Sequence, residues 1–360
     1  MKYYMPVRVY DEPECVLNHK EEIVSYGHKA LIVTGRRSAQ KCGALGDVVS
    51  ALKQCGREYA VYNKIEENPS METIMDASSF GRSEQVDFVI GIGGGSPLDA
   101  AKAIAFMIRR NSDNPDDLYD ASLAADALDV IAVPTTCGTG SEVTGVSVLT
   151  VHAKNTKISI PHKIFPKLAL IDGKYLSSAP HSMIVNTSID AFAHMSESYL
   201  SKKADVYSQS AALTGLKLWS EVKDVLTQER EADGQDYAKL MRASTFGGIA
   251  IAQTGTSIPH ALSYILTYDQ KIPHGKAVGY FLGRFIGFAD EADQKAILDA
   301  AGFESADELN TFLSRVFGEY EVKRETLQRA YDTVSANAVR MQGSRVEMDP
   351  EKLRVIVNLH

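Results

Sequence analysis

The sequence predicts an α/β domain built on a parallel sheet, followed by an all-helical domain, and three observations support this fold class. Short β-rich runs alternate with amphipathic stretches in the first half. A glycine-rich turn follows one of these runs. After about Leu176, long blocks of helical periodicity replace the strands. Continuous apolar strands separated by helices are typical of a parallel sheet covered on both faces.

The composition excludes several classes of protein. A chain of 360 residues is long enough for two domains, and 38 basic against 46 acidic residues give a net charge of -8. That balance argues against a nucleic-acid partner, which favours a basic surface. No apolar run reaches the ~18 residues of a membrane span, and the N-terminus lacks the apolar stretch of a secretory signal. Four irregularly spaced cysteines form no disulfide pattern, so we expect a cytoplasmic protein without a membrane partner.

The strands of the first half are expected where β-rich runs occur, at 30–34, 58–62, 87–92 and 129–133, with further β content at 146–151 and 168–171. Helices are expected at 45–54 and 71–80, and, in the second half, at 184–200, 211–226, 240–252 and 277–288. Gly173 and Pro180 mark the change, which predicts domains at 1–176 and 177–360. In such folds ligands bind in a crevice at the carboxyl ends of the strands.

The first chemical motif is a glycine-rich turn, Gly91-Ile-Gly-Gly-Gly-Ser-Pro-Leu-Asp-Ala-Ala-Lys102, which follows a strand and opens a helix. Glycines let the backbone approach an anion, and a helix N-terminus offers N–H groups and a positive dipole end. A pyrophosphate is the expected occupant, and a tight turn without ligand is the alternative. Ser96 stands where the last glycine of the usual dinucleotide fingerprint would be.

A second polar loop, Pro134 to Thr144, follows the strand at 129–133 with five hydroxyl side chains and two glycines. It could donate hydrogen bonds to a bound nucleotide, although a helix N-cap turn would use the same residue types. Two such loops after successive strands favour the nucleotide interpretation.

Four residues of the helical half have the character of metal ligands. Asp190 and His194 are four apart, which places both side chains on one face of a helix. His260 and His274 each open an apolar helical stretch. An Asp–His hydrogen bond within a helix is the alternative for the first pair alone. Three histidines in apolar surroundings with one carboxylate favour a divalent metal.

With these residues in view, the chain resembles the iron-containing (group III, metal-dependent) alcohol dehydrogenases from Tyr4 to about residue 345. The similarity is carried by GGGSPLDAAK at 93–102, PTTCGTGSEVT at 134–144, Asp190-x-x-x-His194, His260, and His274 in a PHG sequence. It implies the dehydroquinate synthase-like fold of that family, with a nicotinamide-binding first domain and a metal-binding second domain. It also implies that Asp190, His194, His260 and His274 are the metal ligands. The cofactor positions that it implies, completed by Asp99 and Ser141 of the same motifs, are Asn68, Gly94, Gly95, Ser96, Asp99, Thr135, Thr136, Thr139, Ser141 and Lys157.

Two departures from the family pattern bear on the site. Ser188 replaces the usual glycine two residues before Asp190. Tyr264 replaces a histidine that many members carry four residues after the third ligand. A phenol is a poor base near neutrality, so we expect a water chain to carry the proton and Tyr264 at most to orient it; a tyrosine that only packs on the metal helix is the alternative.

The resemblance implies hydride transfer between a nicotinamide cofactor and a small alcohol or aldehyde, with a divalent metal acting on the substrate oxygen. After the first strand, Gly35 stands where an aspartate would exclude a 2′-phosphate, and Arg36, Arg37 and Ser38 follow. This pattern favours NADP(H) over NAD(H). Fe²⁺ is the expected metal, and Zn²⁺ or another divalent ion suits the same ligands.

Two alternative functions stay open. One is a polyol oxidoreductase similar to glycerol dehydrogenase, or a dehydroquinate-synthase-like enzyme, for which a different ligand set is expected. The other is a nucleotide-binding regulatory protein with a structural metal. The sequence leaves the particular alcohol open, and the resemblance implies a homodimer.

Overall fold

The computed structural model describes residues 3–154 and 156–359, and packing divides the chain into two compact units. The sheet unit comprises Met5–Thr136 and Gly140–Ala179. The helical unit comprises Pro180–His360 together with Met1–Tyr4 and Cys137–Thr139. The sequence does not show that Cys137–Thr139, in the middle of the second polar loop, belong to the helical unit. The domain limits 1–176 and 177–360 stay a prediction.

The sheet unit contains a six-stranded sheet in which every paired strand runs parallel, in the order β1-β8-β5-β4-β2-β3. This confirms the predicted fold class of the first half. The strands are β1 (Arg8–Asp11), β2 (Lys29–Gly35), β3 (Glu58–Ile65), β4 (Phe88–Gly93), β5 (Asp129–Pro134) and β8 (Leu168–Ile171). The short, largely polar β1 was not predicted. The run at 146–151 forms a separate antiparallel pair, β6 (Val148–Val151) with β7 (Thr156–Ser159).

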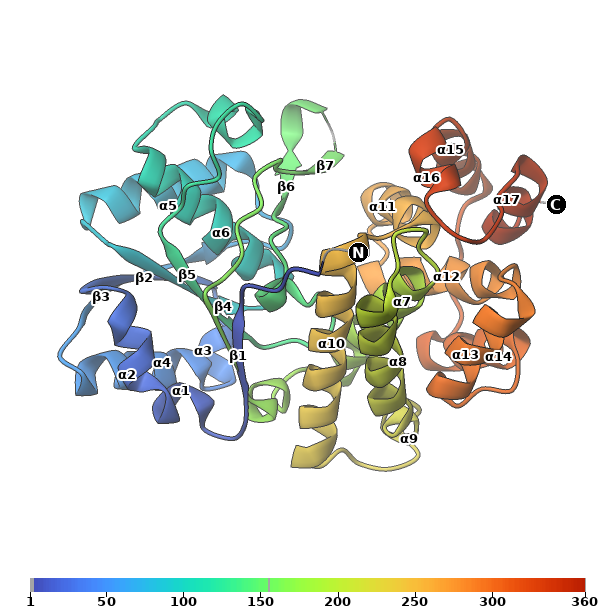
Figure 1. The fold of residues 1–360 in the computed structure, drawn as a ribbon, viewed down its shortest axis with the longest axis horizontal. Helices are drawn as coiled ribbons and strands as arrows, with labels where there is room; N and C mark the ends of the chain where they lie inside the picture. The colour runs from blue at the N-terminus through green and yellow to red at the C-terminus, as the bar shows by residue number, and fades with distance from the viewer. Residues whose placement is uncertain (1–2, 155, 360) are drawn as a thin grey trace. The chain divides into compact units, whose positions relative to one another are not determined.

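Helices cover both faces of the sheet, as Figure 1 shows for the unit coloured blue to green. Alternate residues of β2 serve the two faces: Leu31 and Val33 belong to one apolar cluster, and Ala30 and Ile32 to the other. The first cluster includes α5 (Met71–Ser83) and α6 (Gly95–Arg110). The second is covered by α1 (Cys15–Asn18), α2 (Lys20–Ile23), α3 (Ser38–Lys41) and α4 (Ala44–Gln54). Short 3₁₀ turns are η1 (Val24–Tyr26), η2 (Pro115–Tyr119), η3 (Ser141–Val143), η4 (His152–Lys154) and η5 (Gly173–Leu176).

The helical unit is built around α7 (His181–Tyr199), which packs against α8, α10 and α12. Among the described residues of this unit, one isolated β-bridge occurs, and it joins Ser201 to Ser344. The remaining helices are α8 (Val206–Ser220), α9 (Lys223–Leu226), α10 (Gly234–Thr254), α11 (Ile258–Gln270), α12 (His274–Gly287), α13 (Glu291–Ala301), α14 (Ala306–Phe317), α15 (Arg324–Ser335), α16 (Ala338–Gln342) and α17 (Pro350–Val357). The predicted helix at 211–226 is in fact two, α8 and α9.

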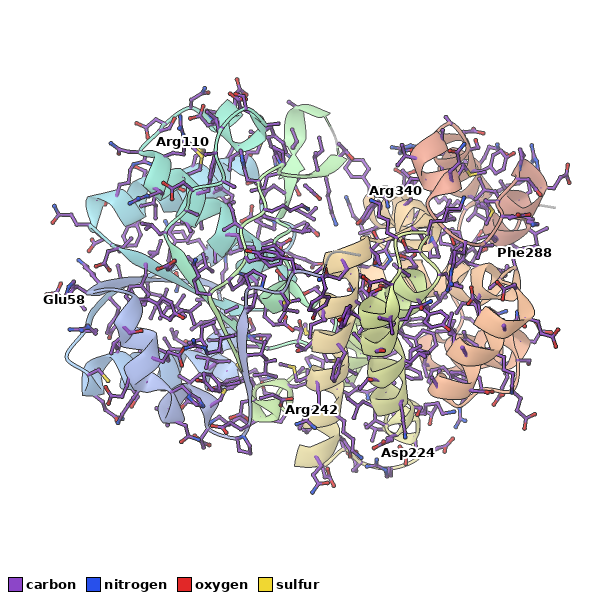
Figure 2. The ribbon with its side chains drawn as sticks, viewed as in Figure 1. Glu58, Arg110, Asp224, Arg242, Phe288 and Arg340 are labelled. Atoms are coloured by element: carbon purple, nitrogen blue, oxygen red, sulfur yellow. The ribbon has the colours of Figure 1, made fainter. Side chains whose placement is uncertain are left out.

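Side chains fill both units, while charged groups such as Glu58, Arg110 and Asp224 stand at the outside (Figure 2). In the helical unit, the fully buried Trp219 donates its indole N–H to the backbone oxygen of Ser188 at 3.1 Å and meets Phe192 edge-on. Ser188 lies two residues before Asp190 on α7, and Phe192 lies midway between Asp190 and His194, so these contacts help to fix that helix. No helix in the described part of the chain is both long and apolar enough to cross a bilayer.

The glycine-rich turn depends on the close approach of α6 to β4. A Cβ added at Gly91 would lie 2.8 Å from Cβ of Ala101, whereas a Cβ at Gly46 on α4 would meet nothing within 4 Å. We expect Gly91→Ala to lower the free energy of unfolding by about 1–3 kcal/mol through overpacking. The matched Gly46→Ala change should raise it by up to about 1 kcal/mol through helix propensity. Unfolding followed by circular dichroism measures both; equal stability of the two variants would contradict the close approach.

Candidate metal centre and cofactor loops

Helix α7 carries the first two predicted ligands. Asp190 and His194 stand one turn apart, and their residues are 4% and 6% exposed. The helix is buried almost all round from Ser188 to Ser198. A carboxylate in such surroundings needs positive partners, because an isolated buried charge is costly.

The other two histidines lie at helix starts. His260 stands in the first turn of α11, after Pro259, and His274 is the first residue of α12, after Pro273. Gly275 lets α12 approach α7 closely, since a Cβ there would lie 1.7 Å from the backbone oxygen of Asn186. The Asn186 side chain also accepts a hydrogen bond from the Lys276 N–H at 3.0 Å. The PHG sequence therefore fixes His274 against α7.

One oxygen, Oδ1 of Asp190, faces all three histidines. It lies 3.2 Å from Nε2 of His260, 3.6 Å from Nε2 of His274 and 3.8 Å from Nε2 of His194. Donor atoms of Asp190, His260 and His274 lie within 4.8 Å of one another, close enough to hold one metal ion. The His194 ring stacks on that of His260, with centroids 4.5 Å apart. The structure thus brings together the four residues predicted as ligands, and His194 as the fourth ligand stays a prediction.

The electrostatics of the cluster suit a cation. Burial alone would raise the pKa of Asp190, but the histidines outweigh it and hold that pKa well below its usual range. Burial is the dominant influence on His194 and lowers its pKa. For His260 burial also acts to lower the pKa, yet the carboxylates of Glu197 and Asp190 prevail and raise it to about 10. Ionised carboxylates buried beside imidazoles are a donor set that a divalent ion would complete.

The far nitrogens of two histidines have acceptors of their own. Nδ1 of His194 lies 3.1 Å from the backbone oxygen of Gly138, and Nδ1 of His260 lies 2.8 Å from Oε2 of Glu197. An Nδ1–H that donates to such an acceptor leaves the Nε2 lone pair for a metal. Glu197 was not predicted; its signal is its spacing, because 190, 194 and 197 share one face of α7.

Tyr264, predicted as a catalytic residue, lies one turn beyond His260 on α11. Its ring is parallel to that of His274, at 6° and 5.6 Å between centroids. Burial raises the pKa of Tyr264 to about 12, although Arg340 acts in the opposite direction. The phenol therefore stays neutral at physiological pH, and its ring packs on that of His274, a predicted ligand.

The predicted phosphate loop forms the N-terminus of α6. Gly94 is the N-cap, and no side chain caps the helix there. Gly93 has a φ of 148°, and a Cβ on it would lie 2.6 Å from Pro97. At Gly94 a Cβ would reach 3.0 Å from Oγ1 of Thr136. Glycines at 93–95 and first-turn N–H groups that no side chain caps fit an anionic group such as a pyrophosphate.

Three predicted cofactor residues are joined beside this helix end. The Asn68 N–H donates to Oγ of Ser96 at 3.0 Å, and Lys157 donates from Nζ to Oδ1 of Asn68 at 2.6 Å. Thr150 of β6 donates to the backbone oxygen of Asn68 at 2.8 Å. The β6–β7 pair thus places Lys157 beside Asn68 and Ser96.

Asp99 and Ser141, also predicted as cofactor residues, contact the fully buried Lys102. Nζ of Lys102 donates to Oγ of Ser141 at 2.7 Å and to the backbone oxygen of Val146 at 2.8 Å, and burial lowers the pKa of this lysine. Ser141 donates to Oδ1 of Asp99 at 2.5 Å, and the Val148 N–H donates to Oδ2 at 2.9 Å. These bonds tie α6 to the chain after the second polar loop, so both residues brace the loops.

The second polar loop is divided between the units. Thr135, whose N–H donates to the Gly93 oxygen at 2.9 Å, and Thr136 belong to the sheet unit, whereas Thr139 belongs to the helical unit. At the end of β2, Arg36, Arg37 and Ser38 are exposed. A Cβ at Gly35 would have Ile65 O as its nearest neighbour at 3.5 Å, so a side chain has room there.

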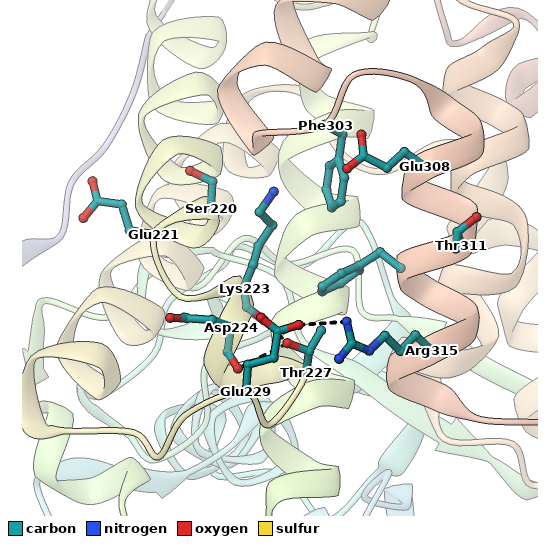
Figure 3. A pocket seen from close by; sticks show the side chains of 11 residues that line it. Ser220, Glu221, Lys223, Asp224, Thr227, Glu229, Phe303, Glu308, Thr311 and Arg315 are labelled. Atoms are coloured by element: carbon teal, nitrogen blue, oxygen red, sulfur yellow. Dashed lines mark hydrogen bonds and ion pairs between the residues drawn. The ribbon is translucent and has the colours of Figure 1, made fainter.

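A cavity of about 480 Å³ lies elsewhere on the helical unit, lined from α8, α9 and α14 (Figure 3). Arg315 in it pairs with Glu229 at 2.8 Å, and Lys223 lies over the Phe303 ring at 4.3 Å. It contains none of the predicted site residues, and four acidic side chains line it against the two basic ones, Lys223 and Arg315.

Comparison with known proteins agrees with this arrangement. Residues 6–173 match the family model described as iron-containing alcohol dehydrogenase, and residues 184–359 match that of the C-terminal region of the Fe-containing alcohol dehydrogenase family. The chain belongs to the iron-containing alcohol dehydrogenase family.

Individual relatives cover most of the chain. A long-chain-alcohol dehydrogenase of Geobacillus thermodenitrificans is 31% identical over 311 residues, which cover 84% of this chain and 77% of the relative. The sulfoacetaldehyde reductase of Bilophila wadsworthia is 29% identical, with 86% of each chain covered. A crystal structure of an iron-containing alcohol dehydrogenase from Thermotoga maritima has 32% identity and a TM-score of 0.89, with 99% of this chain and 98% of that one covered.

Removal of one predicted ligand tests the metal centre. We expect His274→Ala to weaken binding of a divalent ion by more than the 10–100-fold typical of outer-shell changes, because one of the donors around Asp190 is lost. Metal content after dialysis, measured by atomic emission, gives the result. His181→Ala, at the start of α7, is the control and should retain the ion. Full metal content in the His274→Ala protein would refute the ligand assignment.

Proposed function

We propose that this chain is a metal-dependent alcohol dehydrogenase and aldehyde reductase that transfers a hydride between NADP(H) and a small alcohol or aldehyde. The observation that supports it most is the convergence of three imidazole nitrogens on one oxygen of Asp190. Asp190, His194, His260 and His274 would hold the divalent ion, with Fe²⁺ as the proposed metal. Such an ion supplies Lewis acidity toward a substrate oxygen, and a nicotinamide carries the hydride.

The residues of each unit have distinct tasks in this proposal. At the N-terminus of α6, Gly94, Gly95 and Ser96 would bind the cofactor pyrophosphate through backbone N–H groups and a hydroxyl. Lys157, beside Asn68 and Ser96, would add a positive charge near the phosphates. In the helical unit, Tyr264 would hold the His274 ring and orient water, and water would carry the proton.

The cofactor preference rests on the end of β2. Arg36 and Arg37 are exposed and form no ion pair within the described residues, so their guanidinium groups are available to a 2′-phosphate. Gly35 presents no carboxylate to repel that phosphate. Two further expectations belong to the proposal: a homodimer, and a cytoplasmic location suggested by four unpaired cysteines. The names of the relatives range from long-chain alcohols to sulfoacetaldehyde, so the proposal defines the substrate as an alcohol or aldehyde.

A nicotinamide absorbance assay tests the activity. Protein loaded with Fe²⁺, and separately with Zn²⁺, is assayed with aldehydes and NADPH and with alcohols and NADP⁺. We expect metal-dependent turnover that a chelator abolishes and that re-addition of the ion restores. A glycerol-selective enzyme would support the polyol alternative. A protein that binds metal and nucleotide but turns over none of the panel would support the regulatory alternative.

Substitutions at the end of β2 test the cofactor preference. Arg36→Ala should lower kcat/KM for NADPH about 10–100-fold, since a hydrogen bond to a charged group contributes about 1.5–3 kcal/mol. Gly35→Asp should disfavour NADPH by like-charge repulsion and leave NADH usable. Gly35→Ala is the matched control, because it adds volume without charge. A wild-type protein that prefers NADH, or an Arg36→Ala protein with unchanged kcat/KM for NADPH, would refute the preference.

A further inference from the structure

We infer that Glu197 is the positioning residue of the metal centre: its carboxylate fixes the His260 imidazole as the tautomer that presents Nε2 to a divalent ion. The inference rests on the metal centre of the proposed function and adds a residue outside the ligand set. Glu197 is fully buried on α7, three residues after His194.

The carboxylate of Glu197 has three donors, all at the start of α11. Oε2 accepts from the Ser257 N–H at 2.9 Å and lies 2.8 Å from Nδ1 of His260, and Oε1 accepts from the His260 N–H at 2.9 Å. Ser257 is the N-cap of α11, yet its side chain makes no capping bond. Glu197 therefore takes the place of the cap, where a negative charge is favoured by the helix dipole.

This arrangement determines the orientation of the ring. Backbone and side chain of His260 bind the same carboxylate, so the imidazole cannot rotate about its χ angles without loss of the 2.8 Å contact. A carboxylate accepts but does not donate, so Nδ1 must carry a proton and Nε2 is the nitrogen left to face Asp190, 3.2 Å away. Carboxylate partners of this kind orient metal-binding histidines in proteins.

A glutamine at position 197 would reverse the proton placement. With its NH₂ group in the place of Oε2, it would donate to Nδ1 of His260 and leave the Ser257 N–H without its acceptor, while its amide oxygen would still accept from the His260 N–H. The neutral ring would then carry its proton on Nε2, which removes the lone pair from the metal side. A capping role alone would not have this consequence.

Titration of the full-length protein with Co²⁺ tests the inference, with affinity and the visible d–d spectrum as readouts. We expect Glu197→Gln to weaken Co²⁺ binding 10–100-fold, to change the spectrum, and to remove the exchangeable Nδ1–H resonance of His260 from the Co²⁺-shifted proton spectrum. Ser305→Ala is the matched control, because Ser305 caps α14 in the same unit by accepting from the Glu308 N–H at 3.1 Å. It should lower the melting temperature and leave Co²⁺ affinity and spectrum unchanged.

The outcomes separate this inference from the proposed function. A wild-type protein that binds no Co²⁺ refutes both. A wild-type protein that binds Co²⁺ and a Glu197→Gln protein with the same affinity and spectrum refute the role of Glu197 alone. If Glu197→Gln does not fold, Glu197→Asp decides, since its carboxylate is withdrawn by one methylene. We expect it to weaken Co²⁺ binding several-fold, and unchanged affinity would overturn the inference.

Discussion

A single buried carboxylate oxygen, Oδ1 of Asp190, constrains the architecture of the helical unit. It lies within 3.2–3.8 Å of three imidazole nitrogens that come from three helices. A negative charge on a buried segment of a helix is costly unless positive groups compensate it. The close approach of α12 at Gly275, the start of α11 at His260 and the position of the Gly138 carbonyl all serve to bring those groups to this oxygen.

At the N-terminus of α6 the sheet unit carries N–H groups that no side chain caps, which suits the proposed binding of an anion. A glycine is required at 93, where φ is 148° and a Cβ would strike Pro97, while a Cβ at Gly94 would make a tight contact of 3.0 Å with Oγ1 of Thr136. The buried Lys102 holds the neighbouring loops by charge-assisted bonds to Asp99, Ser141 and Val146. Residues predicted as cofactor contacts thus fall into two kinds: those at the helix end that are open to a ligand, and those such as Asp99 that brace the loop behind it.

Much of this could be predicted from the sequence, for physical reasons that differ between elements. Strands β2, β4 and β5 are buried on both faces and therefore read as continuous apolar runs. The edge strand β1 carries a polar sequence and gave no such signal. The β content predicted at 146–151 is confirmed as β6, but periodicity does not reveal that this strand pairs antiparallel with β7 outside the main sheet. The four residues predicted as metal ligands were chosen by chemistry and spacing, and the structure brings them together.

Glu197 and Gly138 were missed because their roles arise only in three dimensions. A glutamate within a helix normally indicates a solvent-exposed face, and nothing local shows that the start of α11 covers this one. Gly138 was assigned to a nucleotide loop, yet its carbonyl supports His194. Side-chain contacts between segments 50 or more residues apart are not encoded in the periodicity of either segment.

The central claim is that one divalent ion binds at the oxygen on which the three histidines converge. Anomalous diffraction at the metal absorption edge, from crystals grown with Fe²⁺ or Zn²⁺, tests it most directly. The account predicts one strong anomalous peak within about 2.0–2.2 Å of the Asp190 carboxylate and of Nε2 of His194, His260 and His274. A peak bound by other residues, or no peak from protein saturated with the ion, would contradict it.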